Sequence, residues 1–216
     1  MSLTFFALGA LGWNASEYLI HRFIGHGPKR KAVGSLLARL TPRGLAAEFN
    51  REHLAHHTDP TYFAPTERKV LAAAAVVPVM GLALAPVVGP RRAVSFSLGF
   101  AAAYGFYEVV HRRIHTHPPT GAYSRWLRRH HLYHHYKTPR DNHGVTSPLF
   151  DLAFGTKKPL ERVRVPRRTA PVWMLDDDGE VRAAYADDYE AVGASRPERA
   201  PTEDRTGRDA AAPAPP

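Results

Sequence analysis

Three long apolar runs set the predicted architecture of the chain. Residues 2–20 and 93–110 carry one charged side chain each, and residues 70–89 carry none. The charge-free run is about as long as the 20-residue helix that crosses the hydrocarbon core of a bilayer. A Gly-Pro pair, a typical turn signal, separates the last two runs. The pattern therefore predicts a membrane helix over 2–20 and a membrane hairpin over 70–110.

The polar segments predict surface structure between and after these runs. Residues 32–40 are expected to form a short amphipathic helix, and a longer helix is expected from Pro42 to about His57. In residues 141–156, Gly and Pro predict a turn followed by a short helix.

The C-terminal part differs in composition from the rest. Beyond residue 156 the long apolar runs stop, and Pro, Ala, Arg and Asp dominate from about Gly193. We divide the chain into a membrane domain (1–156), a loosely structured extension (157–192) whose residues 173–189 dock as a strand or short helix, and a disordered tail (193–216). The predicted fold class is all-α, an integral-membrane helical bundle of about three to four spans with a helical, histidine-rich cap on the cytoplasmic side.

Ten of the thirteen histidines fall into four groups with the spacings HX4H, HX2HH, HX3H and HX2HH. In an HX2HH helix the three imidazoles lie on neighbouring turns of one face. Because the hairpin returns the chain to the side it left, all four groups are expected at one membrane face. Ten imidazoles packed there without metal would leave many polar atoms unsatisfied. The candidate metal ligands are His21, His26, His53, His56, His57, His111, His115, His131, His134 and His135.

The number and kind of ligands restrict the chemistry. The chain has no cysteine, so only His, Asp and Glu can hold a metal. Ten imidazoles exceed the roughly four to six coordination positions of a single metal ion, which implies a pair of metal ions. Imidazole suits Fe, Zn, Cu or Ni, and the motifs of metalloproteases, serine hydrolases and nucleotide-binding proteins are absent. Activation of O2 against a lipid C–H bond fits such a site. A non-catalytic metal-binding or metal-transporting membrane protein is the alternative, and predicts metal uptake without O2 consumption.

Four further polar residues are candidates for supporting the ligands. Glu17 lies one helical turn before His21 and is expected to accept a hydrogen bond from its ring. Glu108 and Asp141 flank the histidine groups. His143 is either a supporting or substrate-channel group or a surface histidine in a turn.

Other side chains receive simpler interpretations. His117 and His130 are taken as ordinary packing or surface histidines. Tyr104, Phe106 and Tyr107 are candidates for lining a substrate channel between the hairpin and the first helix.

The charge is unevenly distributed. Residues 1–156 carry 18 Lys and Arg against 8 Asp and Glu, whereas residues 157–216 carry 11 against 12. A basic body suits nucleic acid, an anionic membrane or an acidic protein partner, but the apolar hairpin argues against nucleic acid. By the positive-inside tendency, the basic face with the histidines is expected to be cytoplasmic, with Arg91 and Arg92 as exceptions at the other end.

The four boxes, HRFIGH, HLAHH, HRRIH and HLYHH, resemble in order those of the integral-membrane fatty acid hydroxylase and sterol desaturase superfamily, over about residues 15–156. The following NHGVTSPLFDLAFGT is similar to the corresponding segment of the fatty acid 2-hydroxylase branch. β-Carotene hydroxylases share an HX4H first box, but their third box is usually one residue longer and they lack a GVTSP-like run. They are therefore the second choice.

The resemblance implies a function and its partners. The ten box histidines would bind a dinuclear non-haem centre, iron in the first place and zinc as the alternative, with O2 as co-substrate. The substrate would be a lipid or fatty acyl chain in the membrane. Electrons would come from a separate donor, cytochrome b5-like or a ferredoxin with its reductase, because the chain has no cytochrome b5 domain. The membrane portion is shorter than is usual in the family.

Overall fold

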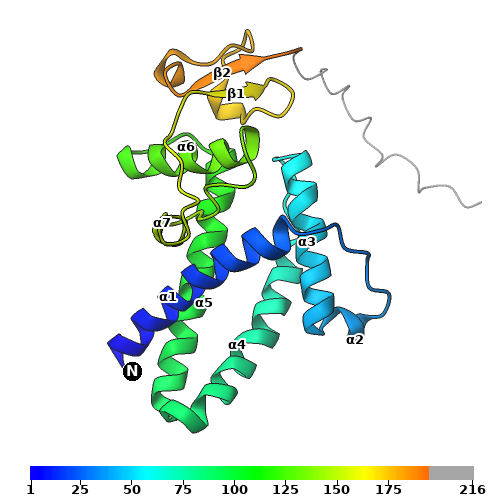
Figure 1. The fold of residues 1–216 in the computed structure, drawn as a ribbon, viewed down its shortest axis with the longest axis vertical. Helices are drawn as coiled ribbons and strands as arrows, with labels where there is room; N and C mark the ends of the chain where they lie inside the picture. Colours follow the sequence, from blue (N-terminus) through cyan, green and yellow to red (C-terminus); the bar gives the residue numbers. More distant parts are fainter. Residues whose placement is uncertain (195–216) are drawn as a thin grey trace, which may run out of the picture.

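The computed structural model describes residues 1–194, and these are mostly helical (Figure 1). The helices are α1 (Leu3–Leu19), α2 (Leu36–Arg39), α3 (Pro42–Thr58), α4 (Thr66–Val88), α5 (Pro90–Thr116), α6 (Ala122–Tyr136) and α7 (Leu149–Ala153). They are followed by β1 (Val163–Pro166), 3-10 turns at Val172–Met174 and Ala183–Tyr185, and β2 (Tyr189–Val192). The predicted all-α class is confirmed. From residue 195 onward, the predicted disordered tail (193–216) lies outside the described residues.

Helices α4 and α5 form the predicted membrane hairpin. They are the two helices in residues 1–194 that are long and apolar enough to cross a membrane. No residue of α4 is buried by the rest of the chain, as expected for an apolar helix that faces lipid. Gly89 joins the two helices with φ of +83°, a conformation that favours glycine, and Pro90 begins α5. Helix α1 has 17 residues, so a third span stays a prediction.

Helix α1 crosses α5 at very close range (Figure 1). A Cβ atom added at Gly99 would lie 1.9 Å from the carbonyl oxygen of Phe6, and one added at Gly9 would lie 2.0 Å from that of Phe96. Small residues at such a crossing allow backbones to touch, the usual packing device of membrane helices. This crossing fixes the end of α1, and therefore the first histidine box, relative to α5.

We expect Gly99→Ala to destabilise the protein, since the added methyl group must push α1 away from α5. The cost should be about 1–3 kcal/mol, as for other overpacked cores. Thermal unfolding in detergent measures it. Gly105→Ala, on the same helix, is the matched control, because a Cβ there meets nothing within 4 Å. Equal melting temperatures for the two variants would contradict the close-packing role of Gly99.

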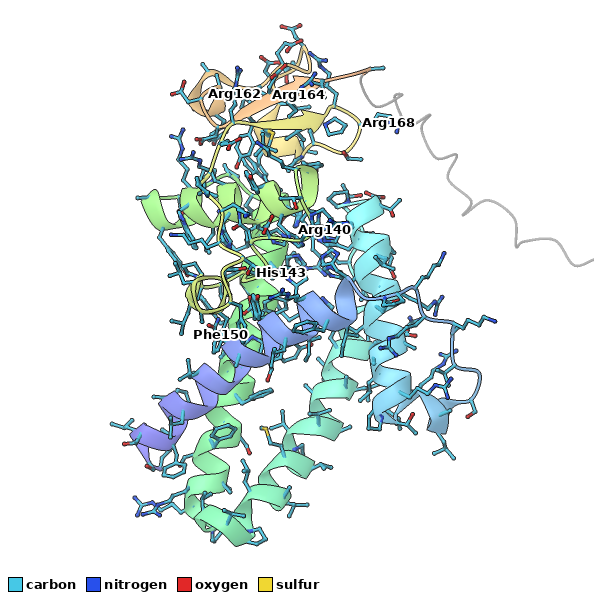
Figure 2. All side chains as sticks on the ribbon, in the orientation of Figure 1. Arg140, His143, Phe150, Arg162, Arg164 and Arg168 are labelled. Carbon is cyan, nitrogen blue, oxygen red and sulfur yellow. The ribbon has the colours of Figure 1, made fainter. Side chains whose placement is uncertain are left out.

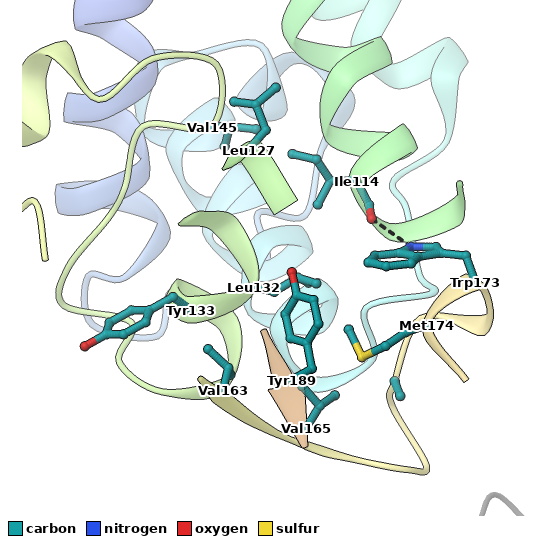
Figure 3. Packing of buried hydrophobic residues seen from close by; sticks show 11 residues of the cluster. Ile114, Leu127, Leu132, Tyr133, Val145, Val163, Val165, Trp173, Met174 and Tyr189 are labelled. Carbon is teal, nitrogen blue, oxygen red and sulfur yellow. Dashed lines mark hydrogen bonds between the residues drawn. The ribbon is translucent and has the colours of Figure 1, made fainter. Parts of the chain in front are cut away.

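The extension over 157–192 is more regular than the sequence predicts. β1 and β2 pair in parallel, with Val163 opposite Tyr189, and their buried side chains pack against α6 and the end of α5 (Figure 3). The indole Nε1 of Trp173 donates to the carbonyl oxygen of Ile114 at 3.1 Å. The burial of Trp173 and Tyr189 agrees with the predicted docking of residues 173–189. The sheet itself was not predicted, because the apolar residues that form this core are scattered singly among charged ones. The extension closes the helical end of the molecule opposite the hairpin turn (Figure 1).

Arg128 belongs to the interior and not to the basic surface. It is 4% exposed, and its guanidinium donates to the carbonyl oxygens of Arg113 and His117. The Arg113 carbonyl, in the last turn of α5, also accepts the backbone N–H of His117, the residue that follows the helix. The cation therefore fixes the end of the helix that carries the third histidine box.

Candidate metal centre

The structure brings the ten box histidines together in two groups of five. Within each group, the potential ligand nitrogens all lie within 4.8 Å of one another. The His21 group consists of His21, His26, His53, His57 and His134. The His56 group consists of His56, His111, His115, His131 and His135.

Each HX2HH box serves both groups. In α3, His53 and His57 join the His21 group while His56 joins the other; in α6 the outer pair joins the His56 group and His134 joins the His21 group. The reason is helical geometry, since positions i and i+4 differ by about 40° around the axis and i+3 lies about 100° from i+4. Each group thus combines one two-histidine box, the outer pair of one HX2HH box and the middle histidine of the other.

The HX4H box depends on a local change of helix type. Five residues of a regular α-helix rotate by about 140°, which would point His21 and His26 in different directions. After α1, however, Ile20–Gly25 form a π-helical turn, in which the His26 N–H donates to the carbonyl oxygen of His21 at 3.1 Å. The wider turn returns the side chain at i+5 to the face of residue i, and such turns are frequent at functional sites.

Asn50 of α3 holds this turn in place. Its side chain is fully buried, and its Nδ2 lies 2.8, 3.1 and 3.3 Å from the carbonyl oxygens of Ile24, Gly25 and Gly27. Its Oδ1 accepts the backbone N–H of Arg30 at 2.8 Å. One amide therefore satisfies the end of the π-helical turn.

We expect Asn50→Leu to lower the metal content by releasing His21 and His26. The variant keeps a similar volume but leaves several buried backbone groups unpaired, at about 1–3 kcal/mol each. Metal analysis of the purified variant should show loss from the His21 group, with the His56 group still loaded. Full metal content in the variant would contradict the positioning role of Asn50.

Several ligand candidates have one ring nitrogen already fixed by a hydrogen bond. The Nδ1 atoms of His21, His134 and His56 donate to the carbonyl oxygens of His143 (2.5 Å), Asp141 (2.7 Å) and Tyr62 (2.8 Å). In each ring this leaves the Nε2 lone pair for a metal.

The remaining nitrogens converge on one another. Nε2 of His26 is 2.9 Å from Nε2 of both His53 and His134, and Nε2 of His115 is 3.0 Å from that of His131. Nε2 of His21 and of His57, and both ring nitrogens of His135, are buried without a hydrogen-bond partner among residues 1–194. Converging and unpaired buried lone pairs are costly unless a cation shares them. The donor set therefore fits a bound metal in each group.

Burial keeps these rings neutral, which is the form that binds metal. Burial lowers the pKa of His57 to about 2, and nearby histidines act in the same direction. Burial also lowers the pKa of His26 to about 4, and the pKa values of His134 and His135 well below their ordinary range. His57 and His135 stack with ring centroids 4.0 Å apart, so the two groups are adjacent.

The loop over residues 141–147 supplies carbonyl oxygens to the His21 group. Asp151 holds this loop: its carboxylate accepts the backbone N–H groups of His143 and Gly144, both at 2.8 Å, and the Thr156 hydroxyl at 2.7 Å. Burial alone would raise the pKa of Asp151, but hydrogen bonds from His130, His143, Thr156 and Gly144 hold it well below its ordinary value.

Glu17 has a different role from the predicted one. Its carboxylate accepts the backbone N–H groups of Val145 and Thr146 (2.5 and 3.2 Å) and the Thr146 hydroxyl (2.9 Å). The expected hydrogen bond from His21 is wrong, because the Nδ1 of that ring is taken by the carbonyl of His143. Glu17 therefore acts one step further out, on the loop that carries this carbonyl.

The other supporting candidates have separate outcomes. Asp141 acts through its backbone carbonyl, on His134. Glu108 pairs with Lys69. His143 is 1% exposed, which excludes the surface interpretation, and its ring lies 5.3 Å from that of His134.

Two further buried groups lie next to the centre: His130, whose predicted packing role is confirmed, and Asp151, which the sequence did not single out. His130 is fully buried and its Nε2 lies 3.3 Å from Asp151, so it is a packing histidine with a specific partner. Asp151 itself lies in the NHGVTSPLFD segment, but carboxylates that bind backbone N–H groups leave no spacing signature.

A cavity of about 400 Å³ reaches both groups. It lies between α1, α3, α4 and α5, and is lined mainly by apolar and aromatic side chains. Its lining contains two histidines of each group: His21, His53, His56 and His111.

Two of the three predicted channel residues lie in this cavity. Tyr104 and Tyr107 line it, whereas Phe106 is 53% exposed and not part of the lining. The prediction for Phe106 is wrong, because residues two positions apart on a helix point in different directions, and Phe106 therefore faces away from the side of α5 that carries Tyr104.

This chain is similar to known proteins in sequence and in fold. Residues 6–156 match the family model described as fatty acid hydroxylase. The dihydroceramide fatty acyl 2-hydroxylase FAH1 of Arabidopsis thaliana is 29% identical over 161 residues, which cover 74% of this chain and 62% of that protein. The ceramide very long chain fatty acid hydroxylase scs7 of Schizosaccharomyces pombe is 30% identical over 168 residues, 74% of this chain and 44% of that one.

A solved structure gives the same result. The structure titled full-length scs7p, with only its hydroxylase domain visible, matches with 28% identity and a TM-score of 0.53, over 72% of this chain and 56% of that one. The chain spans at most 62% of the length of these relatives. The family match over more than half of the chain nevertheless decides the classification: this protein belongs to the fatty acid hydroxylase family.

Proposed function

We propose that the chain is a membrane-bound, O2-dependent dimetal hydroxylase of a lipid acyl chain, with the ten box histidines as metal ligands. The observation that carries the proposal is the apolar cavity whose lining contains ligand candidates from both groups. The named activities of the relatives, fatty acyl and ceramide hydroxylation, support it.

Iron is the proposed metal. Imidazole nitrogen suits both iron and zinc. Oxidation of an acyl chain requires a metal with redox chemistry, and zinc has none. A bound iron pair would supply the redox chemistry that activates O2 toward the C–H bond. In the overall reaction one oxygen atom enters a C–H bond, and the other leaves as water with two electrons and two protons.

The protein would contribute binding, orientation and exclusion of water. The acyl chain would enter from the bilayer between α1 and the α4–α5 hairpin, where the cavity lies. Trp13 packs with ring centroids 4.7 and 5.4 Å from those of Tyr104 and Tyr107, which gives that wall a fixed aromatic surface. Asn50 would hold the π-helical turn that carries the first box, and the 141–147 loop would orient imidazoles through its carbonyl oxygens. Arg128 would fix the end of α5.

The electron donor would be a separate protein that docks at the cytoplasmic end. Exposed arginines lie at this end, Arg140 near His143 and Arg162, Arg164 and Arg168 on the extension (Figure 2), although Arg164 pairs with Glu190 of the same extension. The surplus of positive charge belongs to residues 1–156, which carry 18 Lys and Arg against 8 Asp and Glu. A basic surface favours an acidic redox partner. With a reconstituted electron donor, the turnover rate is expected to fall as salt is added, since salt screens the electrostatic attraction between the donor and the hydroxylase. A salt-independent rate would remove the docking proposal.

Lipid analysis of expressing cells tests the proposed function. Cells that express the wild type under ¹⁸O2 should contain an acyl lipid with one ¹⁸O atom, absent from cells that express His134→Ala. A hydroxylated carotenoid ring instead would favour the carotene hydroxylase alternative. If the metal-loaded protein forms no oxygenated product with a competent electron donor, the result would favour a non-catalytic metal-binding protein.

A further inference from the structure

One histidine outside the four boxes lies against the His21 group. His143, in the loop after α6 (Figure 2), is 1% exposed. The centroid of its ring lies 5.3 Å from that of His134, 5.4 Å from that of His21 and 5.9 Å from that of His26. Rings within the group are 4.5 to 6.5 Å apart, and the distances of His143 fall in this range. It is not one of the five residues whose ligand nitrogens all lie within 4.8 Å of one another, so it stands at the rim of the group.

The backbone holds His143 from both sides. Its N–H donates to Oδ1 of Asp151 at 2.8 Å, and its carbonyl oxygen accepts from Nδ1 of His21 at 2.5 Å. The preceding residue, Asn142, has a φ of +56°, a left-handed conformation that is uncommon outside glycine and that clusters at functional sites. Asn142 is fully buried, and its N–H donates to the carbonyl oxygen of Thr156 at 2.9 Å. An unusual backbone conformation is thus fixed at the residue that brings His143 to the His21 group.

The ring of His143 lies between this group and a carboxylate. Its Nδ1 is buried 3.8 Å from Oδ1 of Asp151 and has no hydrogen-bond partner among residues 1–194. Since an N–H···O bond measures about 2.9 Å, a movement of roughly 1 Å would form one. Histidines that bind a metal through one ring nitrogen commonly donate the N–H of the other to a carboxylate. An ion bound at Nε2 of His143 would leave Nδ1 to donate to Asp151.

On the basis of the proposed function, we infer that His143 is an eleventh metal ligand and the sixth imidazole of the His21 group. The other group has five, so the two ions are not equivalent. A full octahedral set leaves the ion of the His21 group no open position, whereas the ion of the His56 group keeps room for a further ligand. Asp151 then has a second task besides holding the loop, because it orients the added imidazole.

Competition with a chelator tests the inference. The full chain, purified in detergent and loaded with Fe²⁺ without oxygen, is titrated with a chromogenic chelator of ferrous iron. His143→Gln keeps an N–H that can donate to Asp151 but has no imidazole nitrogen for the ion. It should release one ion at a chelator concentration at least about tenfold lower than the wild type does, and the other ion as the wild type does. His143→Phe, which keeps a flat ring, should behave in the same way.

A Mössbauer spectrum of the protein loaded with ⁵⁷Fe²⁺ separates a ligand from a supporting residue. The wild type should give different signals for its inequivalent ions, at equal intensity. His143→Gln should change one signal and leave the other in place, because only the ion of the His21 group loses a nitrogen.

His130 offers the matched control. Its Nε2 lies 3.3 Å from the other carboxylate oxygen of Asp151, but its ring stacks on Trp126 and it belongs to neither group. His130→Gln should therefore keep the iron affinity and both signals of the wild type, and melting temperatures are compared for all variants. Wild-type iron affinity in His143→Gln, an equal loss in His130→Gln or an unchanged Mössbauer spectrum would overturn the inference while the dimetal centre stands. A well-folded wild type that binds no iron would remove the proposed function with it.

Discussion

Replacing His135 with alanine is expected to abolish hydroxylation and to remove one metal ion from the chain. Both ring nitrogens of His135 are buried without a partner among residues 1–194, and the ring stacks on His57 of the other group. It therefore stands where the two groups meet. Loss of a residue that merely supports a ligand lowers activity or metal affinity about 10–100-fold, so loss of a ligand should cost at least about 100-fold.

His117→Ala is the matched control for this variant. His117 is exposed on the segment after α5 and belongs to neither group. Metal content and product formation should stay at the wild-type level in the control. A His135→Ala protein that keeps its full metal content and activity would show that the His56 group is not a metal site.

Asp151→Asn is expected to destabilise the protein by about 3–5 kcal/mol, the usual cost of breaking a buried charged network. The amide has the same shape but turns N–H donors toward groups that already donate: the backbone of His143 and Gly144, the Thr156 hydroxyl and His130. The 141–147 loop would then lose its support, and with it the carbonyls that orient His21 and His134. Chemical unfolding and metal analysis measure both effects.

The effect of Asp151→Asn should also depend on pH. The pKa of Asp151 is lowered in the folded state, so its stabilising contribution is complete above the unfolded pKa of about 3.9 and is lost as the pH falls below it. The difference between wild type and variant should thus be full at pH 7 and smaller near pH 3. Asp176→Asn, in an exposed turn of the extension, is the control and should cost less than about 1 kcal/mol. Equal effects of the two substitutions would contradict the role assigned to Asp151.

The sequence predicts the parts of this site that follow helical periodicity. The histidines within each HX2HH and HX3H box share one side of a helix because i, i+3 and i+4 positions are neighbours in any α-helix, and the apolar run over 93–110 locates the helix that carries the HX3H box. The division of each HX2HH box between two groups follows from the same geometry, but only the positions of the partner helices show which histidine joins which group.

The contacts that hold the ligands could not be predicted in this way. The π-helical turn at Ile20–Gly25 depends on a buried amide from α3, Asn50, about 25 residues further along the chain. Glu17 binds the backbone of Val145 across 128 residues, a contact between a side chain and backbone atoms that has no residue-type signature. The small sheet of the extension was missed because short strands with few apolar residues gain their core only from α6.

The most direct test is the metal content of the purified wild-type protein, measured by inductively coupled plasma mass spectrometry. Two groups of five histidines predict about two ions per chain, mainly iron, falling to about one in His135→Ala and unchanged in His117→Ala. A well-folded wild type that binds no metal, or binds it with an affinity that neither group's histidines affect, would contradict the central claim that these ten side chains form a dimetal centre.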